Sequence, residues 1–221
     1  MYPFARILAA TTCLGLFAGA ASATIIDGAI TAGTALSAGG TFIKLTVPFI
    51  ESDPDSTVGD DNFQSPNLYA FDEVQNIAVE DTPIPFDVGP DGSAGSVAVG
   101  AVVASHYIIF DPRQSLSLSG WVDFDSEIYG VVTETATFGP SDTLANPGVT
   151  YLSPAARGLE SETVTISGSR LYLNNWTASS PGDVVRVFTD RSPLADVPVP
   201  ASLPLLLAGL GGLFGLRRLR A

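Results

Sequence analysis

The 221-residue chain carries 23 acidic and 10 basic side chains, for a formal net charge of −13 at pH 7. All 23 acidic residues lie in residues 24–196, where only six basic residues accompany them, so this segment alone has a net charge of −17. Such a segment repels nucleic acid and anionic membrane surfaces, which argues against both as partners of the body.

Residues 1–23 have the layout of a secretory signal peptide. Arg6 supplies the positive charge, residues 7–21 are apolar with small side chains, and Ala21-Ser22-Ala23 forms an A-x-A cleavage site before Thr24. We therefore predict a signal helix, export by the general secretory route and a mature chain that begins at Thr24. Cys13, the only cysteine, is removed with the signal, so the mature chain has no disulfide framework and no thiolate metal site.

Residues 24–196 have the length of one secreted domain and the pattern of strands. Apolar and polar residues alternate along residues 43–49 and 116–124, and Gly120 is predicted at a bulge or bend. Further strands are predicted at residues 97–104, 106–110, 128–138, 163–167, 171–176 and 184–189, with turns rich in Gly, Pro, Asp and Ser between them. The fold class predicted is all-β: an antiparallel β-sandwich of jelly-roll or immunoglobulin-like type.

An acidic loop at residues 51–62 is the first candidate binding site. Its carboxylates, from Asp53, Asp55, Asp60 and Asp61, are hard oxygen ligands suited to calcium. Their spacing is not that of an EF-hand loop, and no Glu occupies the twelfth position. The alternative is a solvated loop with no ion, since charged loops are common without one.

His106 is the only histidine and the first candidate for catalysis. With Asp111 and one of many serines it has the residue types of a nucleophilic triad, but no G-x-S-x-G elbow presents a serine. We therefore favour a hydrogen-bonded structural histidine and no catalytic residue.

Asp123, Asp125 and Glu127 are the residue types that a glycosidase uses in pairs. Strand alternation sets Asp123 and Asp125 opposite the apolar face of residues 122 and 124, so a solvated outer face also explains them. The aromatic residues Trp121, Tyr129 and Trp176 could stack on sugar rings if exposed, although aromatics on strands more often pack in a core.

Residues 197–221 form a membrane-directed tail. Val197-Pro198-Val199-Pro200-Ala201 leads into an uncharged apolar stretch, residues 202–216, which is short for a transmembrane helix. Arg217, Arg218 and Arg220 follow and should stay cytoplasmic, which sets the body on the far side of the membrane. The alternative to a processed signal is a permanent membrane anchor that is never cut.

This tail resembles the PEP-CTERM sorting signal, in particular its VPLPA-CTERM variant with a Val-Pro-Leu-Pro-Ala box, a hydrophobic helix and an arginine cluster. Val199 stands where that variant usually has Leu. The resemblance implies an exosortase-type membrane protease as partner, removal of the tail, and delivery to the cell surface or the extracellular polysaccharide matrix of a Gram-negative bacterium.

The body is similar to uncharacterised exported proteins that carry this type of tail. The similar segments are residues 105–107, 110–112, 157–160, 180–183 and 186–187. We expect residues 157–160 and 183–186 to make local ion pairs that fix their loops. This similarity implies one secreted domain and no particular activity.

The sequence therefore predicts a secreted, non-enzymatic protein with a structural or adhesive role in the surface layer, in association with extracellular polysaccharide. A carbohydrate-binding module is the alternative, and a secreted hydrolase ranks last.

Overall fold

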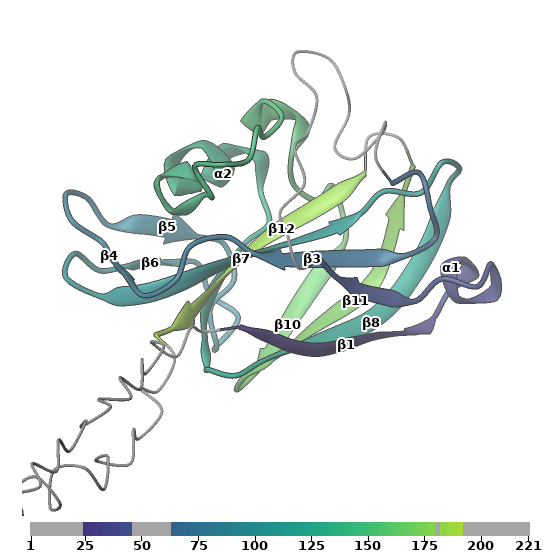
Figure 1. Cartoon of the computed structure of the whole chain (residues 1–221), viewed down its shortest axis with the longest axis horizontal. Coiled ribbons are helices and arrows are strands. Elements are labelled where there is room, and N and C mark those ends of the chain that lie inside the picture. Colours follow the sequence, from purple (N-terminus) through teal and green to yellow (C-terminus); the bar gives the residue numbers. More distant parts are fainter. Residues whose placement is uncertain (1–23, 46–62, 180–181, 192–221) are drawn as a thin grey trace, which may run out of the picture. The chain divides into compact units, whose positions relative to one another are not determined.

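Strands are the main regular secondary structure of the described residues, as the sequence predicts. The computed structural model describes residues 24–45, 63–179 and 182–191, which all fall in one compact unit (Figure 1). The strands are β1 (Ile25–Ala32), β2 (Phe42–Lys44), β3 (Leu68–Asp72), β4 (Ile77–Ala78), β5 (Ile84–Phe86), β6 (Gly95–Val97), β7 (Val102–Phe110), β8 (Leu116–Phe124), β9 (Ile128–Val132), β10 (Thr163–Ser167), β11 (Arg170–Ala178) and β12 (Asp183–Asp190). The helical segments are short: α1 (Thr34–Ser37), α2 (Thr135–Ser141), and the 3-10 turns η1 (Asp142–Leu144) and η2 (Pro154–Ala156).

These strands form two large sheets and a hairpin. One sheet has the order β1-β8-β11-β10, and the other has the order β2-β3-β7-β12-β9 with β4 also paired to β7; β5 and β6 pair with each other. In Figure 1 the first sheet lies below β3, β7 and β12. The prediction of antiparallel pairing is confirmed for all strand pairs except β2 and β3, which run parallel. Parallel neighbours require a long connection, and residues 45–67 supply it.

A shared apolar core holds the two large sheets together. Leu118 and Val122 of β8 and Trp176 of β11 belong to the same buried cluster as Ile108 of β7 and Val185 of β12. The opposite face of β7 and β12 is covered by a second cluster that includes Phe86 of β5 and Phe138 of α2. Because β7 and β12 are buried on both faces, their sequences are nearly continuous apolar runs without alternation.

Strand β8 has the bounds that alternation predicts, and its centre is Gly120. A Cβ atom built on Gly120 would lie 2.3 Å from the carbonyl oxygen of Ala29, so only glycine permits this approach of β1. The predicted irregularity lies in the neighbouring strands: the register of β1 shifts between Ile30 and Ala32, and that of β11 shifts between Leu173 and Trp176.

Several predicted boundaries are wrong. The predicted strand at residues 97–104 is interrupted at Gly100, whose φ of +86° belongs to a turn, and β7 starts at Val102 and continues through Ser105. The predicted strand at residues 128–138 ends at Val132, before α2. Strand β3 was not predicted, because its run of buried side chains carries no period-two signal. Among the described residues, no helix has the length and apolarity needed to cross a membrane.

Candidate functional site

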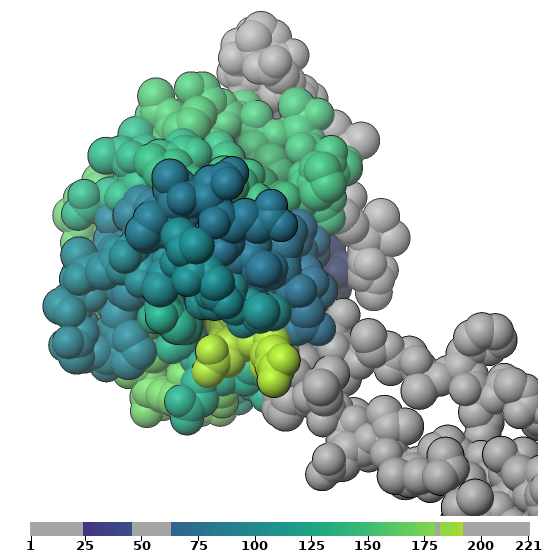
Figure 2. All heavy atoms as spheres, turned by 90° about the vertical axis from the view of Figure 1, so that its left-hand side faces the viewer, coloured from purple at the N-terminus to yellow at the C-terminus, as the bar shows by residue number. Residues whose placement is uncertain are grey.

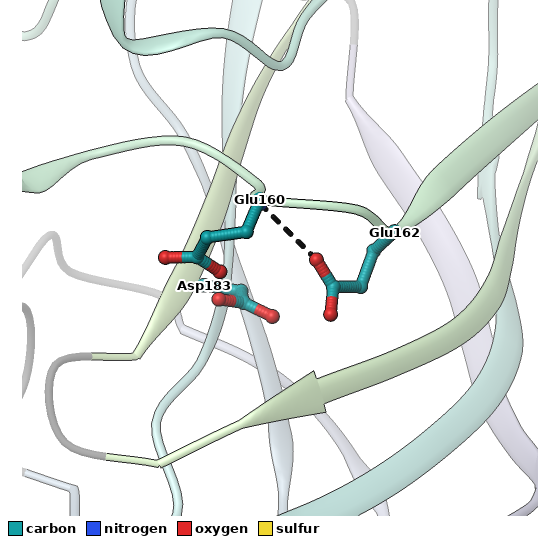
Figure 3. Close-up of side chains that lie close together, drawn as sticks. All are labelled: Glu160, Glu162 and Asp183. Atoms are coloured by element: carbon teal, nitrogen blue, oxygen red, sulfur yellow. Dashed lines mark hydrogen bonds between the residues drawn. The ribbon is translucent and has the colours of Figure 1, made fainter.

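Three carboxylates converge where β10 and β12 begin. Glu160 and Glu162 lie in the loop before β10, and Asp183 is the first residue of β12. One carboxylate oxygen from each residue lies within 4.8 Å of those of the other two. Figure 3 shows the three side chains turned toward the same small volume. We call Glu160, Glu162 and Asp183 the acidic cluster.

Backbone contacts fix the loop that carries the two glutamates. The N–H of Leu159 donates to the carbonyl of Thr133 at 2.7 Å, and the N–H of Val184 donates to the carbonyl of Gly158 at 3.5 Å. Gly158 has a φ of +130°, and a Cβ there would lie 2.9 Å from the Thr133 carbonyl. A glycine is therefore required at position 158. The Val184–Gly158 hydrogen bond places the loop directly beside the start of β12.

Hydrogen bonds also orient Glu162. Its Oε2 atom accepts from the backbone N–H groups of Glu160, at 3.1 Å, and Ser161, at 2.9 Å; the first of these bonds is the dashed line in Figure 3.

Asp183 differs from its two neighbours because it is buried. The residue is 3 % exposed, and its Oδ2 atom has no hydrogen-bond partner among the described residues. Burial, together with the negative charges of Glu162 and Glu160, raises the pKa of Asp183 to about 8. Glu160 is exposed and Glu162 half-buried, so solvent reaches the cluster from the loop side. These three residues could hold a metal ion.

His106 is buried and hydrogen-bonded through both ring nitrogens. Nδ1 lies 2.8 Å from Asp72 Oδ1, and Nε2 lies 3.0 Å from Thr189 Oγ1. Carboxylate, imidazole and hydroxyl thus stand in the order of a nucleophilic triad, but with partners other than the predicted Asp111 and serine. Both His106 and Thr189 have 0 % exposure, so a substrate has no approach to the hydroxyl in this conformation. The geometry agrees with the structural role that the sequence favours.

Asp72 connects this histidine to the start of the body. Its Oδ1 accepts from the N–H of Ile25 at 3.0 Å, and its Oδ2 accepts from Thr24 Oγ1 and lies 2.8 Å from Lys44 Nζ. Lys44 Nζ also donates to Thr24 Oγ1. Burial alone would raise the pKa of Asp72, but His106, Lys44 and the Ile25 N–H together hold it well below its usual range.

The expected local ion pairs in residues 157–160 and 183–186 are wrong. Arg157 binds Asp142 through two hydrogen bonds of 2.6 and 2.9 Å. Arg186 binds Glu73 in the same bidentate way and also reaches Asp142 at 2.8 Å. Both arginines therefore pair across the fold, which leaves Glu160 and Asp183 to face each other in the acidic cluster.

Of the predicted carboxylates, Asp123 lies on the outer face of the four-stranded sheet, and Asp125 and Glu127 lie in the turn between β8 and β9. Asp123 binds Arg170 at 2.5 and 2.6 Å, and the Arg170 guanidinium lies 4.0 Å from the ring of Trp121. Asp125 accepts a hydrogen bond from the N–H of Thr24 at 2.9 Å, and Glu127 is exposed. Alternation is thus confirmed, since residues 122 and 124 are buried on the other face.

The three aromatic candidates have different environments. Trp176 has 0 % exposure and belongs to the core, which is the more common environment for a strand aromatic, so it is not available for sugar stacking. Trp121 is half-buried under Arg170. Tyr129 lines a hollow of ≈ 520 Å³ with Glu127, Asp91 and Asp190. Figure 2 faces this side of the molecule, where the end of β12 (yellow) lies near the blue segments that include β4–β6.

Two sets of predicted site residues lie outside the described residues. They are the calcium-loop candidates Asp53, Asp55, Asp60 and Asp61, and the processing residues Ala21, Ala23, Val197, Pro198, Val199, Pro200, Ala201, Arg217, Arg218 and Arg220. They remain predictions from the sequence.

The acidic cluster is not predicted from the sequence. Glu160 and Asp183 are 23 positions apart, and only the fold brings them together. The sequence feature that could have indicated the cluster is that both residues fall in segments similar to other exported proteins, at residues 157–160 and 180–183. No protein-family model matches the chain, and no similarity to a curated protein or to a solved structure reaches significance.

Proposed function

We propose that this protein is an exported, non-enzymatic component of the cell surface or extracellular polysaccharide layer, with a structural or adhesive role. In this proposal a signal helix directs export, and an exosortase-type protease recognises the C-terminal box and transmembrane helix and releases the body. The two large sheets then constitute a β-sandwich of jelly-roll or immunoglobulin-like type outside the cell.

The observation that carries the proposal is the environment of Thr24. Its backbone nitrogen lies 2.9 Å from Asp125 Oδ1, and its hydroxyl donates to Asp72 at 2.8 Å. Cleavage after Ala23 converts that nitrogen into an α-ammonium group, and a carboxylate at hydrogen-bond distance is the partner that such a group requires. The predicted cleavage site and the folded body therefore fit each other.

The ionisable groups support a non-enzymatic role. His106 is held between Asp72 and Thr189 in the interior, and the buried Arg186 is bound to Glu73 and Asp142. Groups engaged in this way stabilise a body that must persist outside the cell. Calcium is the cofactor that the proposal implies, because a strongly acidic extracellular body attracts divalent cations.

Intact-mass analysis with cell fractionation tests the proposal. We expect surface or secreted material whose mass begins at Thr24 and lacks the tail, and a membrane-bound precursor that retains residues 197–221. Accumulation of the full-length chain in the cytoplasm would refute the export proposal.

A carbohydrate-binding module is the second candidate, and the position of Tyr129 favours it. The tyrosine lines the ≈ 520 Å³ hollow beside the carboxylates of Glu127, Asp91 and Asp190, which is a combination that suits sugar stacking and hydroxyl hydrogen bonds. Glycan-array binding by wild-type protein, lost in Tyr129→Ala and retained in Tyr172→Ala, would support this function. Tyr172 is the matched control because it is an exposed tyrosine on β11, outside the residues that line the hollow.

A further inference from the structure

We propose that Glu160, Glu162 and Asp183 bind one calcium ion. This inference rests on the proposed function only for the supply of calcium outside the cell. The site itself is independent of the predicted calcium loop at residues 51–62.

The separation of the three carboxylates fits one shared ion. Calcium binds oxygen ligands at about 2.3–2.6 Å, so two oxygens on opposite sides of the ion lie about 4.8 Å apart. Each residue of the acidic cluster offers an oxygen within 4.8 Å of the other two. A single ion can therefore contact all three side chains with the backbone as it stands.

The buried aspartate is the second, independent observation. Asp183 is only 3 % exposed, and its Oδ2 lacks a partner among the described residues. A polar atom buried without a partner destabilises a fold, and a carboxylate beside two others does so strongly. Figure 3 shows its carboxylate directed toward those of Glu160 and Glu162. A cation in this volume would supply the missing contact and offset the repulsion.

The ligand atoms favour calcium among divalent cations. All three are carboxylate oxygens, without the nitrogen or sulfur ligands that zinc and copper prefer. Calcium accepts six to eight oxygens in flexible geometry, whereas magnesium demands a near-ideal octahedron at about 2.0–2.1 Å. Because Glu160 is exposed, water can complete the coordination from the loop side.

The ion would connect the two large sheets. Glu160 and Glu162 precede β10 of the four-stranded sheet, and Asp183 opens β12 of the other sheet. Binding should therefore stabilise the folded state against unfolding by mass action, in addition to neutralising local charge.

Calorimetry on the full-length protein, purified in mild detergent and stripped of metal with EGTA, tests the proposal. The titrant is CaCl₂, and the thermal midpoint is measured with and without calcium. We expect a binding event that Asp183→Asn weakens at least tenfold. At calcium 100-fold above Kd the wild-type midpoint should rise by about 5–10 °C, and that of Asp183→Asn should not. Asn keeps the shape of Asp and cannot ionise, so this variant should fold, with an unchanged or higher midpoint in EGTA.

Two controls separate this site from other acidic residues. Glu127→Gln removes one exposed carboxylate elsewhere and should leave the calcium response unchanged. The quadruple replacement of Asp53, Asp55, Asp60 and Asp61 by Asn should retain the binding event that Asp183→Asn weakens. Three results would each overturn the proposal: calcium affinities that Asp183→Asn leaves unchanged, the absence of binding up to 10 mM calcium (about tenfold above the roughly 1 mM weak limit for extracellular sites), or tighter binding of magnesium. None of these outcomes depends on where the cell delivers the protein, so failure here differs from failure of the proposed function.

Discussion

Arg186 and Glu73 form a bidentate ion pair in which both side chains have 0 % exposure, with Nε–Oε2 and Nη2–Oε1 distances of 2.8 and 3.0 Å. Ser105 and Tyr151 donate the remaining hydrogen bonds to Glu73, at 2.6 and 2.5 Å. Burial and the adjacent Glu73 charge raise the pKa of Tyr151, so its hydroxyl stays protonated as a donor. The pair thus has the full set of partners that a buried charge requires.

Removing one member of this pair should destabilise the protein strongly. Glu73→Leu leaves the Arg186 guanidinium buried without its main counter-charge, which costs about 3–5 kcal/mol in the free energy of unfolding. Urea unfolding followed by circular dichroism measures the loss. The double variant Glu73→Leu/Arg186→Met removes both charges and should be less destabilised than the sum of the two single variants. Additive losses would show that the pair is not coupled.

Asp72 should make the fold sensitive to acid. Its pKa in the folded state is held below the unfolded value of about 3.9, so the folded state binds fewer protons than the unfolded state in that range. The stabilisation is complete above about pH 5 and is lost progressively as the pH falls below about 4. Unfolding midpoints in urea between pH 2 and 7 measure this loss. Asp72→Asn should be less stable at pH 7 and show a shallower decline in acid; an identical decline would contradict the assignment.

The mature N-terminus should depend on Asp125. When cleavage leaves Thr24 first, its α-ammonium lies at the 2.9 Å distance from Asp125 Oδ1 that the backbone N–H now has. This half-buried pair should contribute about 0.5–1 kcal/mol to the free energy of unfolding. Asp125→Asn should therefore cost more stability in the secreted form than in a precursor that retains residues 1–23. Equal costs in the two forms would exclude the ion pair.

Gly120 should tolerate no side chain. Gly120→Ala introduces a Cβ 2.3 Å from the Ala29 carbonyl oxygen, and this distance can only grow if β1 moves away from β8. We expect a loss of about 1–3 kcal/mol, as for other overpacked interior positions. Gly139→Ala is the matched control, because the nearest atom to its Cβ is the Pro154 side chain at 3.6 Å. A similar effect of both substitutions on the urea midpoint would mean that the contact at Gly120 relaxes freely.

Local patterns predicted β8 well because one of its faces is buried and the other is solvated, so alternation marks every residue. Strand β3 and the two faces of β7 gave no such signal, since burial on both faces removes the alternation. The parallel pairing of β2 with β3 depends on contacts between distant segments, which periodicity does not encode.

Contacts between distant segments also determine the candidate site, and the sequence pattern does not encode them. The sequence favours a hydrogen-bonded structural His106, but it does not predict the partners Asp72 and Thr189, which lie 34 and 83 positions away. The acidic cluster likewise brings Glu160, in the loop before β10, next to Asp183 of β12. Residue type indicates which chemistry is available, whereas the approach of distant carboxylates is a property of the tertiary fold.

The C-terminal tail should be a processed signal and not a permanent anchor. Its uncharged stretch, residues 202–216, is short for a bilayer span and follows a box whose prolines interrupt a helix. Replacing Pro198, Pro200 and Ala201 should block maturation and leave the protein in the inner membrane with its terminal arginines attached. Pro193→Ala is the control, because Pro193 lies outside the box and its replacement should leave maturation intact. Intact mass of the wild-type surface protein decides the matter: a mass that extends through Ala221 would make the chain a simple membrane-anchored β domain.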